Sequence, residues 1–415
     1  MHQLQIPPSP GDQFFYVGGE AEFENMLNYK RHGSHPVILG DILPKPSTCV
    51  SDPAKKPRYR IIMKLGFGAF CTGWLARDLV ENRYVAVKVC LGSDTAHENG
   101  ETEILSQLHE TGRGKHGYER VIQLFDAFII EGPNGFHECL VTEVVAPLSD
   151  YDVQRWCSSE TIRQIIEGFA FLHEQGIAHG DPHNGNFGIA VPELEQFDEE
   201  AIAEYVGGPD TIPVVPIDPS LALHSLPPYL VERLSIVGFL QEQKSFPTGS
   251  EMSVRIMDFG RSYRTSEKVP SLPGAAPYEI RPPEVAMHDL SKGKVGSIWS
   301  EAADIWAVGC TLYHIRRGGE LISTGGSAND RLFHAVDFGG PPPQDWPELW
   351  NDGRKTLRPF NRVKAWEETE ANCSDEKRKF LDLIKKMIVT KPDERSPMAE
   401  LLTHPFVQRR SSNGC

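Results

Sequence analysis

The sequence predicts an α+β protein built as two lobes, a small strand-rich lobe followed by a larger helix-rich one. In the first third, apolar runs alternate with turn residues, and Val85, Val87 and Val89 alternate as in a half-buried strand. From residue 158 onward, apolar residues recur at helical spacing instead, as in "SSETIRQIIEGFAFLHEQG". A chain of 415 residues is long enough to bury a core in each lobe.

The segments of the two lobes follow in order along the chain. The first lobe contains strand-like runs, "YRIIMKLGFGAFCTGWLARD", "RYVAVKVCL", "VIQLFDAFII" and "HECLVTEVV", with one helical run, "ETEILSQLHE". In the second lobe the first helix is expected to be capped by Ser158 or Ser159 and to stop at Gly176. Later helical runs are "EAADIWAVGCTLYHIRR", "DEKRKFLDLIKKMIV" and "SPMAELLTHPF".

These segments predict the following domain boundaries. We expect an N-terminal extension, partly ordered and with little core, over residues 1–56. The main domain is expected over 59–407, with its small lobe at 59–145 and its large lobe at 146–407, and residues 408–415 form a tail.

A spacer interrupts the large lobe at residues 191–252. Its first part is acidic and its middle is rich in Pro and Gly, which predicts poor order apart from a short helix near "PYLVERLSIVGFL". Deleting residues 193–250 is therefore expected to leave the core folded.

The composition restricts the classes of function. The net charge of -15 disfavours bulk nucleic-acid binding and an anionic membrane surface; it suits a basic partner, or serves only solubility. No apolar run reaches the roughly 20 residues of a membrane helix, and no secretory signal pattern is present. The eight cysteines form no C-x-x-C pair and read as reduced thiols. We expect a monomer in the cytoplasm, the nucleus or both.

The "GFGAF" stretch and a strand lysine suggest a phosphate site. Gly66 and Gly68 would let backbone N–H groups approach phosphate oxygens, although a plain hairpin turn has the same signature. Lys88 lies inside an apolar strand and needs an anion, which Glu103 on the following helix could supply. A lysine reaching out to solvent is the alternative.

The stretch "GIAHGDPHNGNFGIA" carries the densest polar chemistry in the chain. His179 and His183 are four residues apart, but Pro182 between them opposes a helix, so metal coordination by the two histidines is disfavoured. Asp181 and Asn186 fit better as a general base and a metal ligand in a loop. In "RIMDFGR", Asp258 ends a strand and would bind Mg²⁺.

Taken in order, these motifs resemble the signature of the protein kinases: glycine loop, strand lysine, helix glutamate, H-x-D-x-x-x-x-N and D-F-G. "RPPEV" resembles the end of an activation segment, and "DIWAVGC" a later kinase helix. "HGSHPVILGDIL" followed by "RYRIIMKLGFGAFCTGWLARD" is similar to the opening of the SR-protein kinases, especially divergent fungal members. That group also carries a spacer before D-F-G.

The resemblance implies ATP and Mg²⁺ as cofactors and a role for each matching residue. The catalytic residues would be Asp181, Lys88 and His183. The nucleotide would be bound by Gly66, Phe67, Gly68, Lys88, Glu103, Thr142, Glu143 and Val145. The metal ligands would be Asn186 and Asp258. Glu284 and Arg395 would form a buried ion pair, and Asp304 would anchor the catalytic loop.

The chain also departs from the kinase pattern. Cys71 stands for the third loop glycine, and Gly73 for the valine over the adenine. Gly180 replaces the loop arginine that receives an activation-loop phosphate, so switching by loop phosphorylation is not expected. His183 replaces the loop lysine, and Ala276 or Pro277 its threonine partner. "HGDPHNGN" is similar to the H-G-D-x-H-x-x-N loop of aminoglycoside and choline phosphotransferases, which work without that lysine.

The function implied is an ATP-dependent serine/threonine protein kinase of SR-protein kinase type. Its substrates would be basic Arg/Ser-rich proteins of the splicing-factor kind, which links it to mRNA processing. Two alternatives remain: a weak or inactive kinase that serves as a binding module, and a small-molecule phosphotransferase.

Overall fold

The computed structural model divides the chain into two compact units. The first unit takes in Met1–Thr102, Gln123–Ala146 and Val191–Pro247, and the second Glu103–Ile122, Pro147–Ala190 and Thr248–Cys415. The residues that the structure describes are 10–97, 100–267, 276–322, 328–344, 346, 362–371 and 373–408. Residues 1–9 of the expected extension and 409–415 of the expected tail lie outside these ranges. The α+β class expected from the sequence is confirmed.

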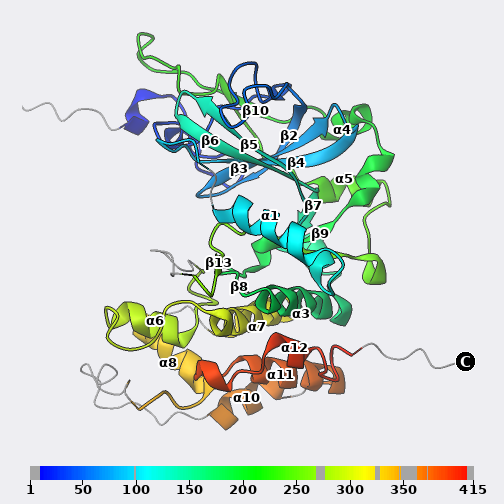
Figure 1. Cartoon of the computed structure of the whole chain (residues 1–415), viewed down its shortest axis with the longest axis vertical. Helices are drawn as coiled ribbons and strands as arrows, with labels where there is room; N and C mark the ends of the chain where they lie inside the picture. Colours follow the sequence, from blue (N-terminus) through cyan, green and yellow to red (C-terminus); the bar gives the residue numbers. More distant parts are fainter. Residues whose placement is uncertain are drawn as a thin grey trace, which may run out of the picture. The chain divides into compact units, whose positions relative to one another are not determined.

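The first unit is built on an antiparallel six-stranded sheet with strand order β1-β2-β3-β4-β6-β5 (Figure 1). The strands are β1 (Ile42–Leu43), β2 (Tyr59–Phe67), β3 (Cys71–Asp78), β4 (Arg83–Cys90), β5 (Leu124–Gly132) and β6 (Gly135–Thr142). Val85, Val87 and Val89 of β4 are buried in the core on one face of the sheet. Lys88, between them, therefore projects to the other face.

The N-terminal extension contributes more core than expected. Met26 and Tyr29 are buried in a cluster with Val214 and Leu230 of the spacer. Lys64 of β2 makes an ion pair with Glu24 of the extension, and its Nζ also donates to the carbonyl of Val231, 3.0 Å away. The expectation of an extension with little core is wrong, because scattered apolar residues among its Pro and Gly pack against the spacer.

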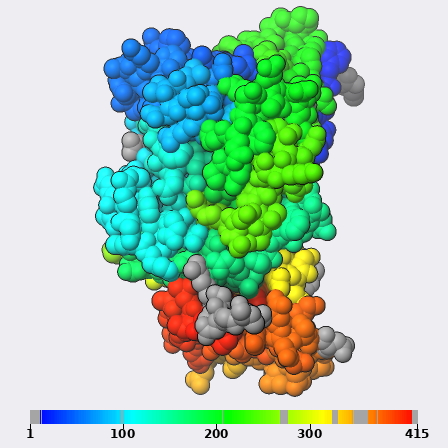
Figure 2. Space-filling view, turned by 90° about the vertical axis from the view of Figure 1, so that its right-hand side faces the viewer, coloured from blue at the N-terminus to red at the C-terminus, as the bar shows by residue number. Residues whose placement is uncertain are grey.

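The spacer is likewise a folded part of the first unit. In that unit it forms η5 (Pro192–Gln196), α4 (Glu199–Val206), β10 (Thr211–Pro213), β11 (Tyr229–Val231) and α5 (Ile236–Glu242), while η6 (Gly249–Glu251) at its end belongs to the second unit. In Figure 2 the green atoms of the spacer lie beside blue atoms from earlier in the chain. α5 provides the short helix expected there, but the expected poor order is contradicted.

The composition of the spacer gave a wrong prediction of poor order, because its acidic residues make hydrogen bonds and ion pairs with the sheet. Glu195 accepts from the backbone N–H of Tyr84 at 2.6 Å, and Glu199 pairs with Arg60 at 2.5 Å. Val231 of β11 is part of the sheet's own core. Deleting residues 193–250 would therefore remove part of the sheet's core, so the expectation that the core stays folded without them fails.

The second unit is mainly helical, as expected. Its helices are α2 (Tyr151–Gln154), α3 (Ser159–Glu174), α6 (Pro283–Leu290), α7 (Glu301–Arg317), α8 (Ala328–Gly339), α10 (Arg362–Glu370), α11 (Asp375–Met387) and α12 (Met398–Leu401). The hydroxyl of Ser158 caps α3, and Gly176 follows the helix with φ +68°. No helix in the described ranges is long and apolar enough to cross a membrane.

Short strands in the second unit hold the polar loops that follow. β8 (Ile177–Ala178) pairs with β13 (Tyr263–Arg264), and β9 (Phe187–Ala190) pairs with β12 (Val254–Ile256), both antiparallel. The stretch that contains Asp181 therefore lies between β8 and β9, and the D-F-G stretch lies between β12 and β13. β7 (Val145–Pro147) stands where the chain leaves the first unit.

Candidate active site

Lys88 of β4 has its anion partner, but the partner is not the expected one. Its Nζ lies 2.7 Å from Oε2 of Glu101 at the start of α1 (Gly100–Gly112), and the Glu101 side chain is 5% exposed. The carboxylate of Glu103 is 57% exposed and lies 3.9 Å from Arg264 instead. The predicted Lys88–Glu103 pair is therefore wrong. Two residues along a helix turn a side chain through about 200°, so Glu101 and Glu103 face opposite ways.

Neutralising Glu101 is expected to lower kcat/KM for ATP by about tenfold to a hundredfold, because a misplaced positioning group has a cost of that order. Glu103→Gln is the matched control: it makes the same change on the same helix and is expected to leave kcat/KM within about twofold. Steady-state kinetics on Glu101→Gln and Glu103→Gln decides which glutamate positions Lys88. The reverse order of effects would restore the pairing expected from sequence.

The glycine loop leaves β2 after Phe67 and re-enters the sheet at Cys71 in β3. The N–H of Gly68 donates to the carbonyl of Cys71 at 2.9 Å, which closes the loop. A Cβ added at Gly66 or Gly68 would meet no atom within 4 Å. Packing therefore does not require glycine at either position, and the open backbone is compatible with close approach of a phosphate. Phe67 is half-buried between the two glycines.

The predicted adenine-binding segment follows β6. Thr142 is buried, and its hydroxyl donates to the carbonyl of Glu143 at 3.2 Å. The backbone N–H of Glu143 already donates to the carbonyl of Gln123 at 3.2 Å. Among the predicted adenine contacts, the N–H of Glu143 is therefore already engaged within the fold.

Asp181 is a half-buried carboxylate with unused hydrogen-bonding capacity. Its Oδ1 is buried and accepts no hydrogen bond from any residue that the structure describes. Burial raises the pKa of Asp181, and the charge of Asp258 adds to the rise, while the imidazoles of His183 and His179 oppose it. A carboxylate that is hard to ionise and short of donors is suited to accept a proton from a bound hydroxyl group.

Asp304 of α7 holds the loop around Asp181 through hydrogen bonds to its backbone. The Asp304 carboxylate accepts from the backbone N–H groups of His179, at 2.7 Å, and Gly180, at 3.1 Å. The expected anchoring role of Asp304 is thus confirmed. The His179 ring joins two segments: Nδ1 accepts from the N–H of Asp181, and Nε2 lies 3.1 Å from the carbonyl of Met257.

Gly180 cannot be exchanged for a larger residue without moving the loop. Its φ is +84°, and an added Cβ would lie 2.4 Å from the carbonyl oxygen of Arg261. An arginine at this position would therefore clash with the backbone conformation that the loop adopts. The structure thus explains why this loop has no arginine to receive an activation-loop phosphate.

His183, at the place of the loop lysine, faces Asp181. Its Nε2 lies 3.7 Å from Oδ2 of Asp181, and its Nδ1 accepts from the N–H of Gly185 at 3.0 Å. Accepting that bond requires an unprotonated Nδ1, so the neutral ring carries its proton on Nε2, toward the carboxylate. The fully protonated ring would balance Asp181 better but would lose the bond from Gly185.

His183→Gln is expected to move the acidic limb of the pH–rate profile to higher pH. A general base works only when deprotonated, so activity is present above the raised pKa of Asp181 and is lost as the pH falls through it. Removing the imidazole removes an influence that lowers this pKa. The measurement is kcat/KM against pH for both proteins, and a limb that stays in place would show that His183 does not act on Asp181.

The two expected metal ligands stand at the ends of adjacent strands. The register pairs Ile256 with Phe187, so Asn186 and Asp258 lie close to the same strand ends. The Asn186 amide donates from Nδ2 to the carbonyl of Asp181 at 2.9 Å, which leaves Oδ1 for a cation. Asp258 has φ +62°, an uncommon conformation of the kind found at functional sites.

This donor set fits Mg²⁺ bound together with a nucleotide. Among the described residues, no group of three or more His, Cys, Asp or Glu could hold a metal ion alone. Mg²⁺ characteristically takes one or two carboxylates, with phosphate oxygens and water completing its shell. One amide oxygen from Asn186 and one carboxylate from Asp258 match that pattern.

The ion pair expected beneath the site is present and buried. Arg395 donates from Nη1 and Nη2 to the two carboxylate oxygens of Glu284, at 2.7 and 2.6 Å. Both side chains are almost fully buried, and Arg395 also donates to the carbonyls of Val389 and Ala302. The prediction of this pair is confirmed, and the pair joins α6 to the segment before α12.

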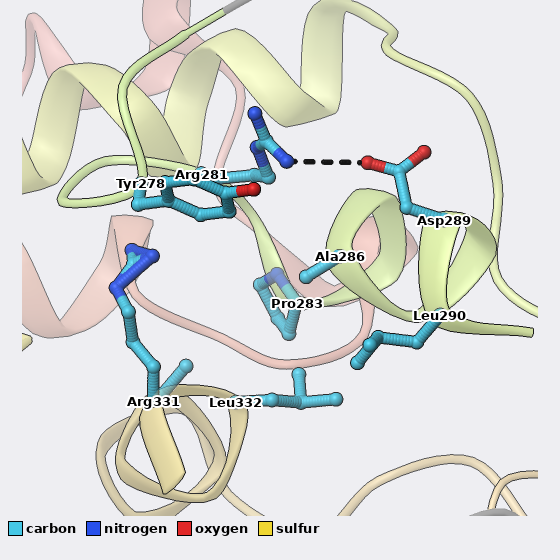
Figure 3. Close-up of a pocket in the computed structure, with 9 residues that line it drawn as sticks. Tyr278, Arg281, Pro283, Ala286, Asp289, Leu290, Arg331 and Leu332 are labelled. Atoms are coloured by element: carbon cyan, nitrogen blue, oxygen red, sulfur yellow. Dashed lines mark hydrogen bonds and ion pairs between the residues drawn. The ribbon is translucent and has the colours of Figure 1, made fainter. Parts of the chain in front are cut away.

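Sequence reasoning missed a pocket between α6 and α8, shown in Figure 3. Its volume is about 190 Å³, and it is lined by two arginines, Arg281 and Arg331, and one acid, Asp289. Arg281 pairs with Asp289 at 3.2 Å and lies over the Tyr278 ring, while burial lowers the pKa of Arg331. This balance of charge disfavours an arginine side chain as an occupant.

A second pocket, of about 220 Å³, opens beside the catalytic loop, and the charges of two of its glutamates also act on Arg331. Its lining includes His183 and Asn184 of the loop, together with Glu279 and Glu320. Two glutamates next to loop residues provide negative charge within the second unit, where a basic side chain could be bound. No sequence motif pointed to either glutamate.

Known proteins are similar to this chain over different lengths. Residues 240–407 match the family model of the protein kinase domain. A serine/threonine protein kinase of Aspergillus fumigatus is 24% identical over 411 residues, which cover 94% of this chain and 91% of that protein. The SKY1 serine/threonine-protein kinase of Saccharomyces cerevisiae is 30% identical over 190 residues, 42% of this chain and 24% of that protein. SRSF protein kinase 3 of Homo sapiens is 30% identical over 187 residues, 41% of this chain and 30% of that protein. Residues 240–407 therefore carry a protein kinase domain, and the chain is distantly similar to fungal serine/threonine protein kinases and to kinases of the SR-protein group.

Proposed function

We propose that this kinase transfers the γ-phosphoryl group of ATP to serines in basic, arginine-rich protein segments. The observation that carries the substrate class is the pocket with Glu279 and Glu320 beside the catalytic loop. The partial similarity to SR-protein kinases points the same way. A net charge of -15 would add long-range attraction for a basic segment.

The roles of the site residues in this proposal follow from their contacts. Asp181 would accept the proton of the serine hydroxyl on its unpartnered Oδ1. Lys88, held by Glu101, would position the α- and β-phosphates, with the glycine loop over them. Asn186 and Asp258 would hold Mg²⁺, which supplies charge to stabilise the transferring phosphoryl group.

The test compares an Arg-Ser repeat peptide with a peptide whose arginines are replaced by glutamine. Glu279→Gln and Glu320→Gln are each expected to lower kcat/KM for the Arg-Ser peptide by about fivefold, since a partly exposed ion pair contributes up to about 1 kcal/mol. The Gln-Ser peptide should respond much less. Raising the ionic strength should slow the Arg-Ser reaction chiefly through association.

The matched control is Glu376→Gln, which removes one carboxylate from the same unit at the start of α11, where Glu376 pairs with Arg316. It should leave both peptides' kcat/KM nearly unchanged. Equal kcat/KM for the two peptides in the wild-type protein would sink the proposed substrate class.

The catalytic loop favours one further candidate, a small-molecule phosphotransferase. Its H-G-D-x-H-x-x-N pattern is that of the aminoglycoside and choline enzymes, and His183 occupies a defined place in it next to Asp181. A panel of amino alcohols assayed beside the peptides separates the two. Turnover of an amino alcohol with no transfer to any peptide would favour this second reading.

A further inference from the structure

Two cysteines face each other directly across β3 and β4. The register pairs Cys71 with Cys90, and both are thiols in the structure. The N–H of Leu91 donates to the carbonyl of Phe70 at 3.0 Å, a bond that flanks Cys71 and Cys90 and marks them as a non-hydrogen-bonded pair. Such pairs have Cα atoms about 4.5 Å apart and the closer side-chain approach. That spacing lies within the range that a disulfide spans, about 4.4 to 6.8 Å.

The pair lies on the face of the sheet that carries Lys88. Because side chains alternate along a strand, Cys90 and Lys88 project to one face while Val87 and Val89 enter the core. Cys71 also closes the glycine loop through the bond from the N–H of Gly68. A covalent link between these two residues would therefore tie down the base of that loop, one pleat from the Lys88–Glu101 ion pair.

The two thiols differ in reactivity. Both thiols are partly exposed, so an oxidant in solution can reach either of them. Burial raises the pKa of the Cys90 thiol well above its usual range, and the charge of Lys88 only partly offsets this. Cys71 is therefore the thiol expected to react first, and Cys90 the one that resolves the product.

We propose that Cys71 and Cys90 form a reversible disulfide under peroxide, and that the oxidised kinase binds nucleotide more weakly. The Cys71 thiolate attacks a peroxide oxygen, which gives a sulfenic acid and releases water once a proton is taken up. The Cys90 sulfur then attacks the sulfenic sulfur and displaces a second water. Two thiols and one hydrogen peroxide thus become one disulfide and two waters, and a dithiol reverses the step by exchange.

The weaker binding follows from the position of the link. Backbone N–H groups of the loop must reorient to point at phosphate oxygens, and a loop fixed at Cys71 is restricted in doing so. This part of the inference rests on the proposed nucleotide role of Gly66 and Gly68. An affinity loss of about tenfold is expected, in line with the cost of misplacing a positioning group.

The disulfide is tested by mass spectrometry on the full chain treated with hydrogen peroxide. Trypsin would release Cys71 and Cys90 in two separate peptides, residues 65–77 and 89–113, each with one cysteine. We expect these two peptides to appear joined after oxidation and separate after dithiothreitol. No joined peptide in the oxidised wild-type protein would overturn the proposal, whatever the kinase activity.

The functional consequence is tested by titrating a fluorescent ATP analogue into reduced and oxidised protein. The wild type should lose about tenfold in affinity on oxidation and recover it with dithiothreitol, because the loop is tied only while the link exists. Cys90→Ser should show the same affinity before and after peroxide. Cys49→Ser, at a cysteine buried in the core of the same unit, should behave like the wild type.

Two outcomes would overturn the functional part. One is a disulfide that forms without a change in affinity, and the other is peroxide sensitivity that persists in Cys90→Ser. A reduced protein that does not bind the analogue at all would instead count against the proposed nucleotide site, while the joined peptides would still decide whether the cysteine pair exists.

Discussion

Asp181→Asn is expected to lower kcat by about a thousandfold, within the range of 10² to 10⁴ that general-base catalysis contributes. Asparagine has the same shape but cannot accept the proton that leaves the serine hydroxyl. The loop should keep its conformation, because its bonds to Asn186 and His179 use the backbone of Asp181. The affinity for a non-hydrolysable ATP analogue should therefore change by less than about threefold.

Stability measurements distinguish this result from a folding defect. The raised pKa of Asp181 means that its ionised form is disfavoured in the folded protein, so a neutral amide should leave Tm unchanged or raise it. Asp375→Asn, at an exposed aspartate at the start of α11, is the matched control and should retain full kcat. Full kcat in Asp181→Asn, or a large loss of ATP affinity with kcat preserved, would remove Asp181 from the role of general base.

Lys64→Met is expected to destabilise the protein by about 3–5 kcal/mol, the usual cost of breaking a buried ion pair from one side. Lys64 is 1% exposed, and its Nζ lies 2.5 and 2.6 Å from the two carboxylate oxygens of Glu24. Tyr29 donates its hydroxyl to the same carboxylate at 2.6 Å. Methionine fills much of the space but leaves the Glu24 charge buried with only the tyrosine as a partner.

The effect is measured as the free energy of unfolding in denaturant, with Tm as a second readout. The double variant Lys64→Met with Glu24→Gln should recover part of the loss, because no charge then remains buried. Lys391→Met is the control, since its pair with Glu394 is exposed and contributes no more than about 1 kcal/mol. A loss in Lys64→Met no larger than in Lys391→Met would show that the extension and spacer are not held to β2 by this pair.

Local signals in the sequence predicted their part of the fold well. Helix α3 follows from the spacing of Ile162, Ile165 and Phe169 and from the cap at Ser158, all of which act within one segment. The strand β4 follows from the alternation of its valines. Both are fixed by neighbours a few residues away, so a single sequence contains enough information to find them.

Features that depend on residues far apart in the chain could not be predicted from the sequence. Glu101 and Glu103 both lie in the first turn of α1, and which of them meets Lys88 depends on how the helix packs against the sheet, which the sequence alone does not fix. The spacer reads as disordered from its composition, yet Val231 is buried beneath strands that come more than 100 residues earlier. The glutamates beside the catalytic loop likewise come together only through the tertiary fold.

The central claim is that this rebuilt catalytic loop still transfers phosphate to protein serines. The most direct measurement incubates the full chain with Mg²⁺, γ-labelled ATP and three acceptors: an Arg-Ser repeat peptide, its Gln-Ser counterpart and a set of amino alcohols. The wild type should label serines of the Arg-Ser peptide, and Asp181→Asn should label them about a thousandfold more slowly. Binding of ATP with no label on any acceptor would contradict the central claim in favour of an inactive binding module, and label on the amino alcohols alone would contradict it in favour of a small-molecule phosphotransferase.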